Sequence, residues 1–150
     1  MFDTGYILKD AGQGTSSGYG TVDAAAQVAE LGDGLVRGNM IVDVSQMALG
    51  GSDELYQIHL MGGDDESFTN EVALATLELG AKEQIEDNKD SKLGRYVVPF
   101  QNEKYGVVYP YVRVRHAIGG TSPAINYEAR LEKNLEVTGF ISTQTSTTTT

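Results

Sequence analysis

The chain has 150 residues, with 21 acidic and 11 basic side chains, 18 glycines, 8 tyrosines and neither cysteine nor tryptophan. Its length fits a single domain, and the lack of cysteine excludes a disulfide scaffold, thiolate metal sites and a thiol nucleophile. A net charge of −10 argues against binding to nucleic-acid phosphates, and the longest apolar run, residues 106–112, is far shorter than a membrane span.

The charge is divided unevenly along the chain. Residues 1–90 carry 4 basic and 17 acidic side chains, a net −13, whereas residues 91–150 carry 7 basic and 4 acidic ones, a net +3. Chance together with solubility explains this division as well as a function does. The alternative is that acidic and basic surfaces of identical copies, or of this protein and a larger assembly, attract each other by complementary potential.

The first part of the chain is predicted to form an N-terminal arm over residues 1–20, because the stretch 10–20 is rich in glycine and serine. The next stretch, 23–31, is ambiguous. Asp23 can cap a helix that stops at Gly32, or the alanines between them can belong to a strand of small residues.

From residue 40 onward the apolar residues alternate with polar ones. Alternation with period two predicts half-buried strands, and stretches rich in Gly, Asp or Asn separate these strands. The sequence therefore predicts an all-β fold, an antiparallel β-sandwich or jelly roll, in a single domain over residues 21–135. The predicted inward residues are Met40, Val42, Val44, Tyr56, Ile58, Leu60, Tyr96, Val98, Phe100, Val112, Val114, Ile125, Tyr127, Ala129 and Leu131.

Two other stretches depart from this alternation. Residues 81–92 are highly charged and fit either a surface helix turn or an excursion between strands. Residues 136–150 are predicted to form a flexible Ser/Thr-rich C-terminal arm, because they bury too little apolar surface to offset the entropy of ordering. We expect the arms to contact neighbouring chains, with an arm that lies along its own sheet edge as the alternative.

The search for catalytic chemistry centres on the stretch 14–18, which matches the Gly-x-Ser-x-Gly pattern of serine hydrolases around Ser16. That chemistry needs a buried strand before the serine, a helix after it and a histidine base nearby. The residues before Ser16 are polar and those after it are glycine-rich, so the match is typical of a Gly/Ser arm. We predict no catalytic residue and no cofactor site, and hence no enzyme.

Metal binding has only weak candidates. His116 continues the apolar face of Val112 and Val114, so it is predicted to be a partly buried, hydrogen-bonded histidine rather than a ligand, and His59 is predicted to be exposed. The acidic run Asp64-Asp65-Glu66 can offer carboxylate oxygens to calcium, but the EF-hand spacing is absent. We therefore predict no metal site.

Tyrosine and arginine gather late in the chain, and both residue types are enriched at protein interfaces. Ordinary packing of a sandwich explains the tyrosines equally well. The candidate interface residues are Tyr105, Tyr109, Tyr111, Arg113, Arg115, Arg130 and Phe140.

One segment resembles a known family. Residues 111–123, Tyr-Val-Arg-Val-Arg-His-Ala-Ile-Gly-Gly-Thr-Ser-Pro, are similar to the late strand and turn of capsid cement (decoration) proteins of tailed bacteriophages, and residues 126–131 resemble their closing strand. Weaker likeness lies at residues 30–32 and 64–69 and at the start of the chain. The order of these motifs carries most of the resemblance, whereas the charged stretch 81–95 and the extension after residue 135 depart from it.

The resemblance implies a jelly-roll domain that binds the outer surface of a phage capsid as a dimer or trimer and clamps neighbouring major capsid protein subunits. It places the protein on the virion surface and, during assembly, in the host cytoplasm, and it implies that residues 23–31 form a strand. An alternative is a carbohydrate-binding or head-fibre jelly roll whose tyrosines stack on sugars. A small hydrolase that uses Ser16 is a third interpretation.

Overall fold

The computed structural model describes residues 6–22, 25–32, 34–81, 84 and 91–133, and their regular structure is all β-strand. No helix long and apolar enough to cross a membrane occurs among these residues. The strands are β1 (Tyr6–Lys9), β2 (Gln13–Gly14), β3 (Gly18–Tyr19), β4 (Thr21–Val22), β5 (Ala25–Ala26), β6 (Ala29–Glu30), β7 (Arg37–Met47), β8 (Leu55–Gly63), β9 (Glu71–Gly80), β10 (Gly94–Gln101), β11 (Glu103–Lys104), β12 (Val107–Val108), β13 (Tyr111–Gly119) and β14 (Ile125–Lys133).

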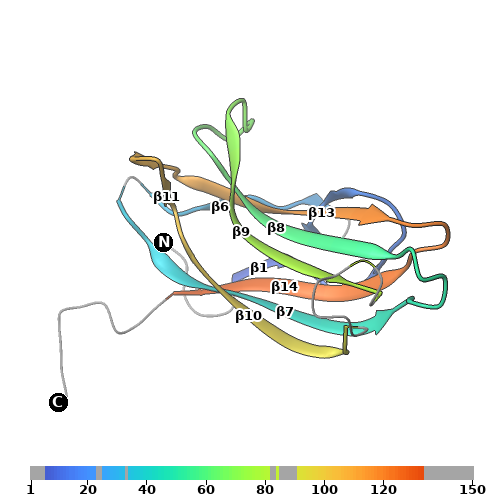
Figure 1. The fold of residues 1–150 in the computed structure, drawn as a ribbon. Coiled ribbons are helices and arrows are strands. Elements are labelled where there is room, and N and C mark those ends of the chain that lie inside the picture. The colour runs from blue at the N-terminus through green and yellow to red at the C-terminus, as the bar shows by residue number, and fades with distance from the viewer. Residues whose placement is uncertain (1–5, 23–24, 33, 82–83, 85–90, 134–150) are drawn as a thin grey trace, which may run out of the picture.

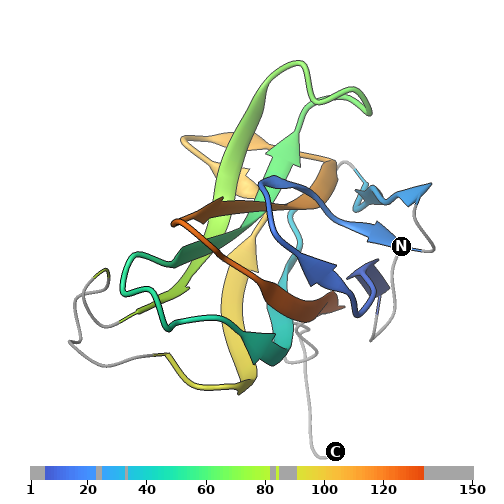
Figure 2. The same cartoon turned by 90° about the vertical axis from the view of Figure 1, so that its right-hand side faces the viewer.

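Two antiparallel sheets face each other as the layers of a sandwich (Figure 1). Sheet A has the order β1-β14-β7-β10, with β2 also on β14, and sheet B has the order β3-β13-β8-β9, with β6 also on β13. The β11–β12 hairpin lies at one end of the sandwich, and the β7–β8 and β13–β14 connections lie at the other end, which faces the viewer in Figure 2. The predicted all-β, antiparallel β-sandwich is therefore confirmed.

Strands from distant parts of the chain lie side by side in both sheets. In sheet A, β7 lies between β14 and β10, and Asp43 on β7 has Arg95 on β10 and Glu128 on β14 as its register partners. In sheet B, β13 pairs with β8 along its whole length, from Tyr111 opposite Gly63 to Gly119 opposite Leu55. Acidic early strands and basic late strands consequently lie side by side.

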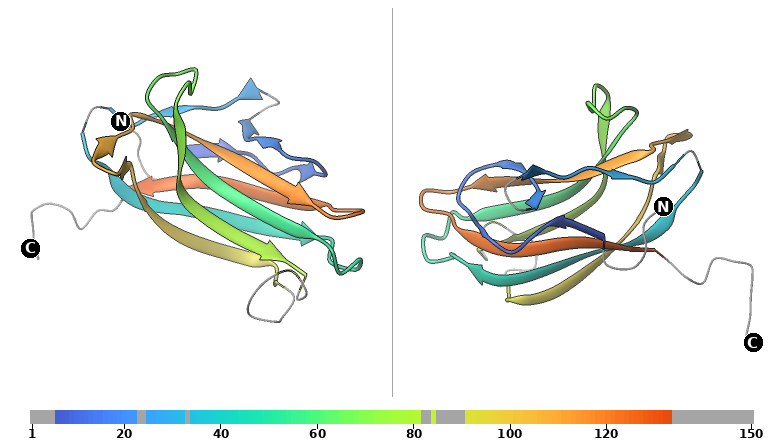
Figure 3. Two further views of the ribbon diagram at one scale, coloured as in Figure 1. Left: turned by 45° about the horizontal axis from the view of Figure 1, so that its top comes forward. Right: turned by 180° about the vertical axis from the view of Figure 1, so that it is seen from behind.

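The described part of the predicted N-terminal arm, residues 6–20, lies on its own sandwich (Figure 3, right). Strands β1 and β2 pair with β14, β3 pairs with β13, and Leu8 is fully buried. A Cβ atom at Gly20 would lie 2.6 Å from the carbonyl oxygen of Leu8, so this close approach requires glycine. The sheet edges of the same chain thus hold this segment, where we expected a neighbouring chain. Residues 1–5 and the predicted arm 136–150 lie outside the described residues.

The ambiguous stretch 23–31 forms no helix where the structure describes it, and it contains two short strands, β5 and β6, separated by residues 27–28. Residues 25–26 pair with β4, and Ala29 pairs with Val112 of β13 and is fully buried. Pairing with β13 overrides the helix propensity of the alanines, because burial against a neighbour outweighs a small local preference. The proposed cap Asp23 lies outside the described residues, as does most of the stretch 81–92, of which Gln84 donates a backbone hydrogen bond to Ala81.

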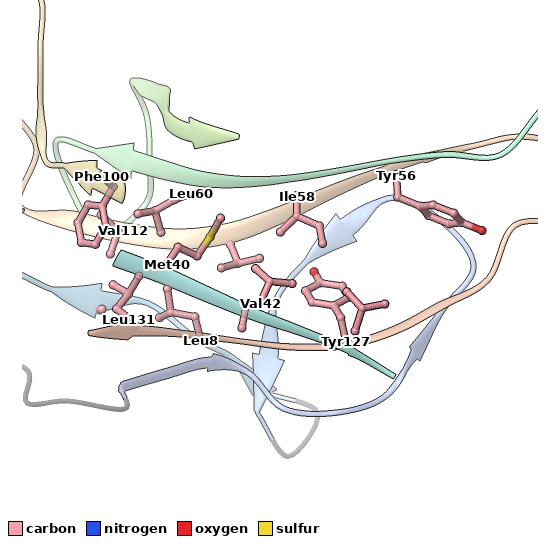
Figure 4. Close-up of a cluster of buried hydrophobic side chains, with 14 of the residues drawn as sticks. Leu8, Met40, Val42, Tyr56, Ile58, Leu60, Phe100, Val112, Tyr127 and Leu131 are labelled. Atoms are coloured by element: carbon pink, nitrogen blue, oxygen red, sulfur yellow. The ribbon is translucent and has the colours of Figure 1, made fainter. Parts of the chain in front are cut away.

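The core lies between the two sheets (Figure 4). All fifteen predicted inward residues line it, and only Tyr96 and Val98 are half-buried, because β10 is an edge strand. Ile41 is the exception to the alternation. It points to the outer face of sheet A yet is 6% exposed, since its register partners Val97 and Arg130 flank it.

The core predicts a strong contrast between two leucines. Replacing the fully buried Leu60 by Ala should lower the free energy of unfolding by about 2–5 kcal/mol, because it removes packing atoms and leaves a cavity. The matched change Leu93→Ala, at a side chain that is 56% exposed, should change it by less than about 0.5 kcal/mol. Urea unfolding followed by circular dichroism measures both values, and equal losses would contradict the assignment of the core.

Candidate interaction surface

Tyr105 occupies the tip of the β11–β12 hairpin and is 91% exposed. Tyr105 and Gly106 both have positive φ angles, 54° and 81°, as in the two-residue turn that matches the twist of paired strands. A left-handed conformation costs a residue with a Cβ atom roughly 1–2 kcal/mol. The hairpin therefore holds an exposed aromatic ring in a conformation that the residue itself disfavours.

Two side chains mount this hairpin on the sandwich. The amine of Lys104 donates to the carbonyl oxygen of Ala73 on β9 at 2.8 Å and lies 5.5 Å from the centre of the Tyr105 ring. Asn102, which is fully buried, accepts from the backbone N–H of Val36 at 2.8 Å and donates to the carbonyl oxygens of Gly34 and Tyr109. Because every polar group of its side chain is bonded, Asn102 fixes the hairpin against the loop that enters β7.

Leu35 lies between Gly34 and Val36, two of the residues that Asn102 binds, and it is 48% exposed. Val107, beside Tyr105 in the hairpin, is 47% exposed. We call Leu35, Tyr105 and Val107 the tip patch. Single exposed apolar residues are common, but three on segments joined by one buried asparagine form a candidate surface for a partner. The sequence indicates only Tyr105 of these, because neither Leu35 nor Val107 stands out in the alternating pattern.

Arg113 makes its contacts with other residues of the same chain. Its guanidinium carbon lies 3.8 Å from the ring centre of Tyr19 and 4.1 Å from that of Phe68, and its Nη2 lies 3.2 Å from a carboxylate oxygen of Glu71. Tyr19 also donates a hydrogen bond to Glu71. A cation between two rings and a carboxylate is stabilised on three sides, so Arg113 joins β3, β13 and the start of β9.

The acidic run at 64–66 serves the same cluster. The carboxylate of Asp65 accepts from the N–H groups of Ser67 and Thr69, and these bonds hold the pKa of Asp65 below its usual value, with Thr69 contributing most. The turn places Phe68 at a φ of 54° and presses its ring onto Gly63, where a Cβ atom would lie 2.5 Å from the ring. Asp65 therefore shapes the turn that brings Phe68 to Arg113.

Arg130 lies on the opposite face of the sandwich, on the outer side of sheet A. Its Nη1 is 3.0 Å from Asp43, and Asp43 also binds Arg95 at 2.8 Å. The hydrogen bond from Arg95 and the one from Arg130 lower the pKa of Asp43, with Arg95 contributing more. Glu128 and Glu132 flank Arg130 at 3.8 and 3.7 Å.

The candidate interface residues thus do not form one surface. Arg113 and Arg115 lie on the outer face of sheet B, Arg130 on that of sheet A, and Tyr105 at the end of the sandwich. Alternation along a strand predicts which side chains share a face of that strand, but it does not predict the sheet to which the strand belongs. Tyr109 and Tyr111 are half-buried, and Phe140 lies outside the described residues.

His116 has the environment that the sequence predicts. It is 7% exposed, and its Nδ1 lies 2.7 Å from the hydroxyl of Tyr127, whose ring meets the imidazole edge-on. Burial, followed by the charge of Lys9, lowers the pKa of His116, and a backbone hydrogen bond with Ser16 opposes this shift only in part. The stretch around Ser16 is therefore a loop along the edge of β13, and the hydroxyl of Ser17 accepts from the N–H of Ile118.

His59 differs from the expectation of an exposed side chain. It is half-buried, and its Nδ1 lies 2.9 Å from the hydroxyl of Thr76 on the neighbouring strand. Burial lowers the pKa of His59, and the charge of Arg115 lowers it further. Arg115 is half-buried, and no ion pair of this residue occurs within the described part of the chain.

No known protein-family model, curated protein sequence or solved structure matches this chain.

The Arg113 cluster predicts that arginine cannot be replaced by lysine. Arg113→Lys keeps the charge but loses the planar group that stacks between Tyr19 and Phe68, so the free energy of unfolding should fall by roughly 1–2 kcal/mol. Arg115→Lys, two residues along the same face, is the matched control and should change it by less than about 0.5 kcal/mol. Urea unfolding measures the free energy of unfolding of both variants. Equal losses in the two would contradict a structural role specific to Arg113.

The environment of His116 predicts a loss of stability in mild acid. The folded chain lowers its pKa below the ordinary 6.5, so the unfolded chain binds the proton more readily, and stability falls as the pH drops below about 6.5. For one proton, the free energy of unfolding cannot change by more than about 1.4 kcal/mol per pH unit. His116→Gln should flatten the dependence of the urea midpoint between pH 8 and 5 more than His59→Gln does. An unchanged slope in His116→Gln would contradict this assignment.

Proposed function

We propose that the protein is a non-enzymatic structural component of a phage virion that binds the outer surface of the capsid and reinforces contacts between major capsid protein subunits. The observation that carries the proposal is the tip patch, an exposed aromatic ring and two exposed aliphatic residues on segments that Asn102 joins at one end of a β-sandwich. The sequence resemblance of residues 111–123 to capsid cement proteins supports the choice of partner.

The mounting of the tip patch suits a binding role. Tyr105 is an amphipathic ring that offers a large contact area and a polar hydroxyl, which is typical of residues that dominate binding energy. Lys104 and Asn102 already hold the hairpin in place in the free protein. Binding therefore requires little further ordering of the backbone, and a pre-ordered surface loses less entropy on association.

A small patch is sufficient on a repeating lattice. If the protein associates as a dimer or trimer, each assembly presents several tip patches to neighbouring capsid subunits. The second contact then forms at a high effective concentration, so modest single contacts multiply into strong attachment. The same geometry links adjacent major capsid protein subunits, which is what reinforcement of the shell requires.

The electrostatics are compatible with this setting. The net charge is −10, and Arg95, Arg113 and Arg130 each bind a carboxylate of the same chain. A continuous basic surface is what binding to nucleic-acid phosphates demands, and the pairing of these arginines removes the main candidates for one. The protein is thus suited to stay on the shell without adsorbing to the genome.

A carbohydrate-binding or head-fibre module is the second candidate, because the exposed ring of Tyr105 can stack on a sugar. Glycan-array binding that depends on Tyr105 would favour this candidate over capsid reinforcement.

The capsid proposal predicts that the tip patch controls attachment. Tyr105→Ala and Val107→Ser should each weaken co-sedimentation with empty heads of the cognate phage, the Tyr105 variant by about tenfold or more. The matched control is Val97→Ser, which changes a similarly exposed valine on the outer face of sheet A and should leave attachment unchanged. The wild-type protein should also raise the temperature at which the heads break, whereas no attachment of the wild-type protein would overturn the proposal.

A further inference from the structure

The outer face of sheet B carries an arginine whose charge is not balanced within the described residues. Arg115 is half-buried, and no carboxylate of these residues forms an ion pair with it. Its register partners are Tyr19 on β3 and His59 on β8, and Arg113 follows two residues away on the same face. Because opposite residues of paired strands lie within contact range, the surroundings of Arg115 supply an aromatic ring and further basic groups.

The acidic side chains of this face are engaged or distant. Glu71 is paired with Arg113, and Glu78 accepts a side-chain hydrogen bond from the neighbouring strand β8. Glu30 on β6 pairs with the first residue of β13, four positions from Arg115. A half-buried charge has lost part of its hydration and is stabilised when a carboxylate binds it. Arg115 is therefore suited to bind a carboxylate from outside its own chain.

The turn between β8 and β9 projects from the same sheet. We call residues 64–70 the β8–β9 arm, which rises from sheet B on the side away from sheet A (Figures 1 and 3). Its acidic residues are all exposed. Asp64 binds Asn70 and Asp65 binds backbone N–H groups, whereas the carboxylate of Glu66 forms no ion pair or hydrogen bond with the described part of the chain. Glu66 thus offers a free carboxylate on a projecting segment.

The arm is already ordered in the single chain. Phe68 is 5% exposed, and its ring centre lies 4.1 Å from the guanidinium carbon of Arg113. The arm begins after Gly63, which is opposite Tyr111, so it starts four residues, or about 13 Å, from Arg115 along β13. The basic and the acidic group are consequently held apart on one rigid face, and little entropy is lost when this face binds a partner.

We propose that the outer face of sheet B is a contact between two copies of this chain, in which Glu66 of each copy binds Arg115 of the other. A face that holds both members of a charge pair at separate places is self-complementary, because a two-fold axis between them forms the pair twice. This reciprocity favours a second copy over an unrelated acidic protein. The ring of Tyr19, 42% exposed beside Arg115, adds apolar contact area.

This contact between copies does not depend on attachment to a capsid. It uses the outer face of sheet B and leaves the tip patch, at the end of the sandwich, free for another partner. A dimer of this kind presents two tip patches.

The test measures association of the full-length protein alone. Sedimentation equilibrium should show a dimer that weakens as the salt concentration rises, because salt screens exposed charges. Arg115→Glu and Glu66→Lys should each raise the dimer Kd at least tenfold, since each variant places like charges at both contacts. The matched control Arg37→Glu changes the net charge equally, at an exposed arginine of β7 in sheet A, and should leave the Kd unchanged.

An equimolar mixture of the two variants distinguishes a reciprocal contact from a general effect of charge. In the mixed dimer, the new acid of one chain meets the new lysine of the other, and the original Arg115 and Glu66 meet at the second contact. The mixture should therefore dimerise about as tightly as the wild type, although neither variant does so alone.

Circular dichroism verifies that each variant folds, and Arg115→Gln replaces Arg115→Glu if the latter does not. A wild type that is monomeric at about 100 μM, a concentration at which a Kd of about 1 μM gives mostly dimer, overturns the proposal. So does a dimer whose Kd is unchanged in the folded variants, or a mixture that associates no more tightly than the single variants. Because no capsid is present, failure of this dimer and failure of capsid attachment are separate results.

Discussion

The structure depends on antiparallel pairing between strands that are far apart in the sequence. Strand β14 pairs with β7, and β13 pairs with β8, so sheet A and, apart from the consecutive pair β8–β9, sheet B form only when the late strands join the early ones. The pairing of β7 with β10 and with β14 places Asp43 between Arg95 and Arg130. Arg130 lies 87 positions after Asp43 in the sequence. Because such long loops must close before contacts compensate for them, a fold of this kind is expected to form slowly. Its charge division along the sequence follows from the same topology, since acidic and basic segments neutralise each other inside each sheet.

The local features of this fold could be predicted from the sequence, and the long-range ones could not. Period-two alternation identified the inward residues, because the direction of a side chain depends only on its own strand. It did not separate the faces of Arg113 and Arg130, because the sheet to which a strand belongs is decided by its pairing partners. Ile41 shows the same limit, since its burial on an outward position comes from Val97 and Arg130 on neighbouring strands.

Composition was least informative where backbone contacts decide the structure. The Gly/Ser-rich residues before Tyr19 suggest a flexible arm, yet their N–H and carbonyl groups pair with sheet edges, which composition does not encode. Of the tip patch, the sequence indicated only Tyr105. The burial of Glu54, which is 2% exposed, gives no signal of its own either, because an acid beside glycines is usually solvated. Gly120 and Thr121, which lie against this loop, come from a distant turn.

The mounting of the β11–β12 hairpin also determines how the molecule carries a load. Lys104 connects the hairpin to β9 of sheet B, and Asn102 connects it to Val36, directly before β7 of sheet A. A force applied at Tyr105 is therefore shared between both layers instead of peeling one strand from its neighbour. Because the force is divided between the two sheets, hydrogen bonds of both sheets oppose it at the same time. We therefore expect the sandwich to resist a pulling force at Tyr105 as one rigid unit.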